Sequence, residues 1–371
     1  MITIGHGLTH WYPATFYLLL PLIGSELGLT YSQIGLIMTC QYVAAAIANV
    51  PGGVLVDTVG RKGLLMAVSL FWVGFPYLLI GFTHSYAMLL ACIALVGFGN
   101  SIWHPTAIPT LGERYPERKG LVLSLHGMGG NVGDAVAPVV IGALLALFSW
   151  RQVVVMNVVP GLVVAALILV LLGTLQFGTK QVARQSLAEY LKGLRILLRN
   201  RALVLLSAGS SFRTMTQAAL LTFLPVFLAR DMGYSPALVG TCLFALQAAG
   251  FAAAPVAGHL SDRMGRGGSP LFIALVALLG FFLYATRPVI QAWLLEATPA
   301  NMGGSSIGVL FGAQAIGGSL GPLLAGLVAD RHGLLATFYF LAATIVVANL
   351  FVLWIPKTAY AVPTSPNTRR R

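Results

Sequence analysis

Apolar runs of about membrane-crossing length follow one another through this chain, with short polar segments between them. A helix needs about 20 apolar residues to cross the hydrocarbon core of a bilayer. Apolar residues make up 57% of the 371 residues and charged residues 9%, which is typical of a polytopic membrane protein rather than a soluble domain. The sequence therefore predicts an all-α polytopic membrane protein with about 11 spans. The expected spans cover residues 2–25, 33–55, 63–82, 87–110, 121–148, 152–174, 203–228, 236–259, 271–297, 303–328 and 333–355.

The positive charges gather in the segments that would share one side of the membrane. The formal net charge is +12, yet the opposite segments carry only Arg151, Arg230 and Arg331. Lysine and arginine accumulate in the cytoplasmic loops of membrane proteins. We therefore expect a multi-pass protein of the cell (inner) membrane with both termini in the cytoplasm. The basic residues then lie at the cytoplasmic surface of the lipid bilayer, and no nucleic acid is expected as a partner.

One long polar stretch, residues 176–202, divides the chain into two halves. Within it, Leu187, Leu191, Leu194 and Leu198 recur at helical spacing, and basic residues take the other faces. This pattern predicts an amphipathic linker helix on the cytoplasmic membrane surface. The expected domains are a six-helix bundle over 1–175, this linker, a second helix bundle over 203–356 and a disordered basic tail over 357–371.

A charged motif follows the second span of each half. It reads G-x-L-x-D-x-x-G-R, and both copies lie in short loops between apolar runs. Its aspartate can pair with the arginine that opens the next helix, and its glycines allow a tight turn. We expect the motif to latch the cytoplasmic gate. The residues assigned to it are Gly53, Asp57, Gly60, Arg61, Lys62, Asp262, Gly265 and Arg266.

A second repeat measures how closely the two halves correspond. A glycine–proline pattern in the fifth span returns 184 residues later (322 − 138), whereas the charged motif returns after 205 residues (258 − 53). The second half is thus 21 residues shorter (205 − 184), roughly one membrane helix. We expect that a ninth helix is missing between Gly265 and Leu271, and a genuine eleven-span protein is the alternative. The residues expected at close helix packing are Gly129, Gly133, Pro138, Gly317, Gly321 and Pro322.

Asp134 differs from the other acidic residues of the chain, because those lie at span ends or in the linker. An ionised carboxylate at the bilayer centre costs about 2.5–3.5 kcal/mol on insertion scales, unless it takes up a proton or meets a cation. His126, Gly130 and Asp134 follow one another at one-turn intervals. We assign proton coupling to Asp134 and His126. The alternative is an aspartate held neutral by hydrogen bonds as a packing device.

Two arginines lie inside expected spans, each with a glutamine one turn on. Arg213 precedes Gln217, and Arg287 precedes Gln291. Arginine stays charged, so a buried guanidinium needs an anionic partner or a wet cavity. We therefore expect an anion-binding cavity that is lined by both halves of the chain and contains these pairs. The alternative is one structural pair between Asp134 and an arginine, with the other arginine hydrated.

Four histidines and a tyrosine are expected to face the same cavity. His6 and His10 lie one turn apart on the first span with Tyr17 on the same face, and His104 and His126 lie in the fourth and fifth spans. A histidine pair can bind zinc, but no carboxylate or thiol lies nearby in the sequence to complete a site, so we expect no metal. His10, His104 and Tyr17 are assigned to substrate binding with the arginines and glutamines. We expect these histidines to line the cavity or to relay protons. The alternative is that they are packing residues whose hydrogen bonds are satisfied within the protein.

The repeated charged motif resembles the signature loop of the major facilitator superfamily of secondary transporters. Residues 97–105, which end in Trp-His-Pro, and the Gly-Gly-Asn run at 129–131 are similar to the fosmidomycin-resistance branch of bacterial facilitators. The resemblance implies two pseudo-symmetric six-helix bundles and efflux of antibiotics or metabolites. The fifth span also resembles the antiporter signature, except that Ala137 replaces the usual glycine before Pro138.

Together these observations predict a proton-coupled secondary active transporter that works by alternating access. Its solute is expected to be a small organic anion, moved outward as a drug or metabolite by proton antiport, with an uptake symporter as the runner-up. A membrane-embedded enzyme is disfavoured, because the sequence has no deep pair of acids, no G-x-S-x-G and no phosphate-binding Gly-Lys-Ser loop. We expect no enzymatic activity and no cofactor. The expected partners of the monomer are its solute, protons and the bilayer.

Overall fold

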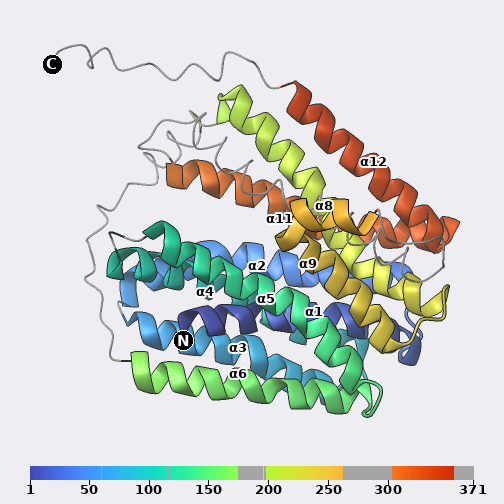
Figure 1. Cartoon of the computed structure of the whole chain (residues 1–371), viewed down its shortest axis with the longest axis horizontal. Helices are drawn as coiled ribbons and strands as arrows, with labels where there is room; N and C mark the ends of the chain where they lie inside the picture. Colours follow the sequence, from blue (N-terminus) through green and yellow to red (C-terminus); the bar gives the residue numbers. More distant parts are fainter. Residues whose placement is uncertain are drawn as a thin grey trace.

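The chain folds into long helices that lie roughly side by side (Figure 1). A computed structural model describes residues 1–59, 61–115, 117, 119–173, 195, 198–261 and 303–354, and no β-strand occurs in that part of the chain. The helices are α1 (Ile2–Glu26), α2 (Tyr31–Val59), α3 (Lys62–Phe82), α4 (Tyr86–Arg114), α5 (Lys119–Leu144), α6 (Trp150–Leu172), α8 (Arg201–Arg230), α9 (Pro236–Ser261), α11 (Gly303–His332) and α12 (Leu334–Leu353).

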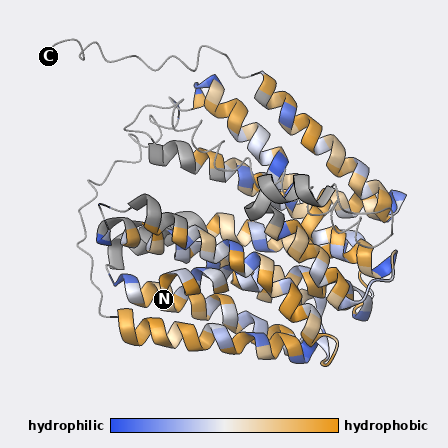
Figure 2. Ribbon diagram, in the orientation of Figure 1, coloured by the Kyte–Doolittle hydropathy of each residue, from blue (hydrophilic) through white to orange (hydrophobic). Residues whose placement is uncertain are grey.

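The helix surfaces are apolar, as a protein dissolved in lipid requires. Figure 2 shows hydrophobic colouring along most of α6 and α12. Over the described residues, eight helices are long and apolar enough to cross a membrane. On α6, Val159, Val163 and Val170 are more than half exposed. Such a face has no favourable contact with water but suits acyl chains.

The expected spans agree with the helices to within four residues wherever the structure describes them, and α5 is the helix that ends clearly earlier than expected. The fifth span was expected to run to residue 148, but α5 ends at Leu144. The chain has to reverse there, because Ser149 and Gln152 form a capping box that begins α6. The span at 271–297, the proposed position of a ninth helix, most of the linker and the tail after residue 354 lie outside the described residues.

The first half is built around α1. This helix contacts α3, α5 and α6, and its side chains Tyr12, Phe16 and Leu19 are fully buried. Its approach to α5 is close because glycines face it. A Cβ on Gly133 would overlap the carbonyl oxygen of Gly7, and one on Gly129 would overlap that of Thr3. The two backbones therefore meet almost directly, which is how small residues let membrane helices associate.

Replacing Gly133 by Ala is therefore expected to force α1 and α5 apart. Overpacking of this kind costs about 1–3 kcal/mol. We expect a clearly lower thermal unfolding midpoint for purified Gly133→Ala protein in detergent. Gly127→Ala on the same helix is the control, since a Cβ there meets no described atom within 4 Å. Equal midpoints for the two variants would contradict this account of the packing.

The two halves meet through two equivalent helix pairs, α2 with α11 and α5 with α9. A Cβ on Gly35 of α2 would overlap the carbonyl oxygen of Pro322, and one on Gly240 of α9 would overlap that of Pro138. Gly35 and Gly240 lie 205 residues apart (240 − 35), the same offset as the two charged motifs. The same contact is thus made twice, as a pseudo-twofold relation between the halves requires.

Polar contacts reinforce the α2–α11 pair at the end where α1 turns into α2. The Asp330 carboxylate accepts hydrogen bonds from the backbone N–H groups of Tyr31 at 2.8 Å and Ser32 at 2.9 Å. An acceptor from one half thus caps the first turn of a helix in the other half. The Thr39 hydroxyl donates to the carbonyl of Ser319 at 2.6 Å. We call this end of the molecule the Asp330 end.

Candidate functional site

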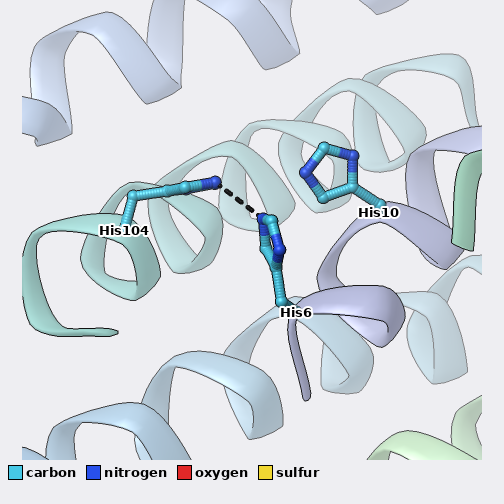
Figure 3. Close-up of side chains that lie close together, drawn as sticks. All are labelled: His6, His10 and His104. Carbon is cyan, nitrogen blue, oxygen red and sulfur yellow. Dashed lines mark hydrogen bonds between the residues drawn. The ribbon is translucent and has the colours of Figure 1, made fainter. Parts of the chain in front are cut away.

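Four histidines from three helices meet in the interior of the first half. His6 and His10 come from α1, His104 from α4 and His126 from α5. Nε2 of His6 lies 3.0 Å from Nε2 of His104, and the rings of His6 and His126 stack with centroids 3.9 Å apart. The His10 ring stands edge-on to His6 at 4.7 Å. Figure 3 shows His6, His10 and His104 turned toward one another. We call these four residues the histidine cluster.

Gly130 of α5 provides the room for this cluster. A Cβ at this position would lie 2.7 Å from Cε1 of His6 and 3.0 Å from Nε2 of His10. His6 and His10 are one turn apart on α1, so both rings reach the surface of α5 at Gly130, where no side chain is in the way. The glycine repeat in the fifth span thus serves close helix packing and also admits two imidazoles.

Asp134 hydrogen-bonds to a residue that its own helix does not supply. Its Oδ2 lies 2.9 Å from Nδ1 of His10 on α1, with both side chains about a quarter exposed (26% and 28%). The alternative of an Asp134–arginine pair is not what the described residues show, because the observed partner of the carboxylate is an imidazole. One-turn spacing had placed His126 and Asp134 on one face of α5, but the contact runs between helices.

The sequence argument against a metal considered only neighbours along the chain, and the structure adds groups from other helices that this argument left out. The third imidazole near His6 and His10 is His104, which is about a hundred residues away, and a carboxylate touches the group through Asp134. Both come from other helices. The ligand nitrogens of His6, His10 and His104 all lie within 4.8 Å of one another.

His126 is the most unusual member of the cluster. Its side chain is 3% exposed, and among the residues that the structure describes neither of its ring nitrogens meets a hydrogen-bond partner. Its backbone carbonyl, by contrast, accepts a 2.6 Å hydrogen bond from Nδ1 of His6. Buried polar atoms normally find a partner. His126 is thus a buried polar group whose two ring nitrogens no described residue satisfies.

The residues assigned to substrate binding are spread over both halves. Tyr17 is buried, and its hydroxyl lies 3.2 Å from that of Tyr42 on α2, whose ring faces Gly318 of α11. Arg213 and Gln217 are half-buried on α8, and each takes part in a polar or ring contact. Arg287 and Gln291 lie outside the described residues.

The charged motif is described in its first copy only. Gly53 and Asp57 fall in the last turns of α2, Arg61 is the exposed residue that precedes α3, and Lys62 begins α3. Gly60, Asp262, Gly265 and Arg266 lie outside the described residues. The packing residues of the second half lie on α11, where a Cβ on Gly317 would overlap the carbonyl of Ser211 and one on Gly321 that of Met215, both on α8.

Sequence reasoning missed a polar group between α1 and α6. Asn157 on α6 is buried, accepts a hydrogen bond from the Trp11 indole N–H and donates to the Thr15 hydroxyl at 3.4 Å. A single asparagine inside the apolar sixth span was the available signal. Buried Gln41 and half-buried Asn100 each have a buried side-chain oxygen without a hydrogen-bond partner among the described residues.

A second polar group stabilises the Asp330 end of the first half. The Arg151 guanidinium forms an ion pair with Glu26 and donates to the carbonyl of Thr83 at 2.9 Å. The Trp150 indole N–H also donates to Glu26. The Arg151 hydrogen bond, followed by that of Trp150, lowers the pKa of the Glu26 carboxyl. One of the few basic residues expected on this side is thus held in place by a carboxylate.

Comparison with known families decides what this arrangement is. The family model described as Major Facilitator Superfamily matches residues 2–286 and 267–370, which together cover almost the whole chain. The chain belongs to the Major Facilitator Superfamily. The superfamily assignment, the helical fold and the expectation of a transporter rather than an enzyme are therefore confirmed.

Individual superfamily members agree with this assignment over nearly their full lengths. The chain is 24% identical to the fosmidomycin resistance protein of Escherichia coli (strain K12), covering 96% of this chain and 91% of the relative. It is 23% identical to the phosphoglycerate transporter protein of Salmonella typhimurium (strain LT2), covering 91% and 83%. The crystal structure of a D-xylose-proton symporter superposes with a TM-score of 0.73 at 15% identity, covering 96% and 97%. This protein is thus a membrane transporter of small metabolites or drugs.

Proposed function

We propose that this superfamily member is a proton-coupled transporter that exports a small organic anion by proton antiport. The observation that carries the proposal is the hydrogen bond between Asp134 and His10 inside the first helical half. A carboxylate and an imidazole can both exchange a proton, and acidic residues within membrane spans commonly relay protons in transporters. The groups that face this pair are His6, His104 and His126.

The anionic character of the solute rests on two supports. Arg213 places a guanidinium half-buried on α8, and Arg287 is a second candidate from the same half. A guanidinium can bind a carboxylate or phosphate through two parallel hydrogen bonds. The names of two relatives point the same way, since phosphoglycerate carries a phosphate and a carboxylate and fosmidomycin is a phosphonate. We infer that His10, His104, Tyr17, Gln217 and Gln291 complete the solute site.

The proposed transport cycle uses the contacts between the halves as one of two gates. With both termini in the cytoplasm, the Asp330 end faces the outside, and its α2–α11 and α5–α9 contacts close it. The charged motifs at the other ends of α2 and α9 would latch the cytoplasmic gate in the alternate state. Rocking of two pseudo-symmetric halves about a central site is how such transporters expose the site to each side in turn. We propose that the functional unit is a monomer.

The test is transport by purified protein in proteoliposomes under an imposed pH difference. For proton antiport, phosphoglycerate or a phosphonate should accumulate on the side with the higher proton concentration, and each solute should move protons the opposite way. Co-directional movement of solute and protons would establish the symport alternative. Solute counterflow that ignores the pH difference would contradict proton coupling.

Arg213→Lys should weaken solute binding while preserving the positive charge. Lysine cannot reproduce the two-pronged contact of a guanidinium, so we expect at least about a tenfold loss of affinity, or about 1.4 kcal/mol. The measurement is stabilisation of the detergent-purified protein by anionic and matched neutral analogues. Arg201→Lys, at the exposed start of the same helix, is the control. Equal stabilisation by both analogues, unchanged in Arg213→Lys, would contradict the anion site.

A further inference from the structure

Three imidazoles of the histidine cluster are arranged as ligands of one ion. The nitrogens of His6, His10 and His104 that can bind a metal lie within 4.8 Å of one another, and the rings come from two helices that enclose them (Figure 3). Imidazole nitrogen is a preferred ligand of zinc, copper and nickel ions. Three histidines with an open fourth position form a known zinc arrangement.

Hydrogen bonds on the far side of two rings fix which nitrogen would bind. Nδ1 of His6 lies 2.6 Å from the carbonyl oxygen of His126 and must donate to it. Nδ1 of His10 lies 2.9 Å from the Asp134 carboxylate. In a neutral imidazole with a proton on Nδ1, the lone pair is on Nε2. A carbonyl or carboxylate behind the ring is how metal-binding histidines are usually oriented.

The spacing of the ligand atoms is close to what an ion requires. Nε2 of His6 and Nε2 of His104 are 3.0 Å apart, so in the metal-free protein one of them shares its proton with the other. Two tetrahedral zinc–nitrogen bonds of about 2.0–2.1 Å place their nitrogens about 3.3–3.4 Å apart. Replacing the shared proton by a metal ion therefore needs an opening of only a few tenths of an ångström between His6 and His104. The His10 nitrogen lies within 4.8 Å of the other two and has to approach to about the same 3.3–3.4 Å spacing.

The surroundings of the three rings also favour a bound ion. The His126 ring stacks on His6, is 3% exposed and leaves both nitrogens without a hydrogen-bond partner among the described residues. A water held by an ion in the cluster could satisfy one of them, and buried waters usually serve such groups. Gly130, which has no side chain, leaves room for the His6 and His10 rings to lie together against α5.

We propose that His6, His10 and His104 bind a divalent transition-metal ion of the zinc type, with the fourth position left to water or to an anion. Asp134 acts as a positioning residue, because it holds His10 in the tautomer that presents Nε2. The ion needs three neutral imidazoles, so protons compete with it for the cluster. The metal site shares His10 and Asp134 with the proposed proton pathway and His104 with the proposed solute site, so metal binding and transport are measured separately.

The test is Co²⁺ binding to the full-length protein, purified without an affinity tag and stripped with a chelator. We expect one equivalent of Co²⁺ per chain, the strong visible absorption of a four-coordinate site and displacement by Zn²⁺. His104→Gln should abolish this absorption. Asp134→Asn should weaken binding by about 10- to 100-fold while keeping the spectrum, as expected when the group behind a ligand is changed. His332→Gln, at the exposed end of α11, is the matched control and should bind as the wild type does.

Co²⁺ binding to the wild-type protein tests the metal site even where a variant of the histidine cluster fails to fold. Absence of stoichiometric Co²⁺ binding by the wild type would overturn the proposal, and so would a six-coordinate spectrum that persists in folded His104→Gln. Transport measured in chelator separates the two ideas. Metal-free protein that still accumulates solute under a pH difference leaves the transport proposal intact, whatever the metal titration shows.

Discussion

Asp134→Asn should abolish pH-driven solute accumulation while leaving solute exchange intact. Asparagine can still accept the hydrogen bond from Nδ1 of His10, so the local geometry is preserved, but its amide cannot carry a proton. A pH difference of about one unit stores about 1.4 kcal/mol per proton, which can sustain about a tenfold solute gradient in a one-for-one exchange. In the variant this gradient should fall to the background level.

The measurement is accumulation in proteoliposomes with the membrane potential clamped at zero, together with counterflow at equal pH on both sides. Asp231→Asn, just after the end of α8, is the control and should behave as the wild type does. Accumulation by Asp134→Asn with the wild-type pH profile would show that the proton is carried elsewhere. His126, which is buried beside His6, would then be the next residue to replace.

Gly35→Ala combined with Gly240→Ala should reduce transport by at least about tenfold. Each added methyl group overlaps a proline carbonyl oxygen of the other half, so the Asp330 end can close only if the helices shift. Overpacking at each position costs about 1–3 kcal/mol, and about 1.4 kcal/mol changes a conformational equilibrium tenfold. The conformation closed at that end should therefore become a minor state.

Two measurements check this expectation. The transport rate should fall, and spin labels on turns 145–149 and 231–235 should report a longer distance across the Asp330 end in the variant. Gly312→Ala on α11 is the control, because a Cβ there meets no described atom within 4 Å. A wild-type rate and distance in the double variant would mean that these glycine contacts do not determine the closed state.

The sequence by itself determined the elements of this protein. In the bilayer core no water can hydrogen-bond to the backbone, so an apolar run of bilayer length must satisfy its N–H and C=O groups internally, as a helix does. The polar residues at the ends of these runs mark the turns. The helix boundaries α1 to α4 agree with the expected spans to within a few residues. The duplicated motif indicated a transporter built from two related halves, because it follows the second span of each half. Single polar residues within apolar runs, such as Asp134, were recognisable as candidates because a polar side chain is costly inside a membrane span.

Only the tertiary structure decided which of these residues meet. Helical periodicity relates a residue to neighbours three or four positions away, so it linked His6 to His10 and His126 to Asp134 but said nothing across helices. The pairing of His10 with Asp134 exists because Gly7 and Gly133 let two backbones touch. His104 joins them from a third helix. Contact between distant helices depends on where small residues let two helix backbones approach each other. This depends on the surfaces of both helices, so one stretch of sequence cannot reveal it.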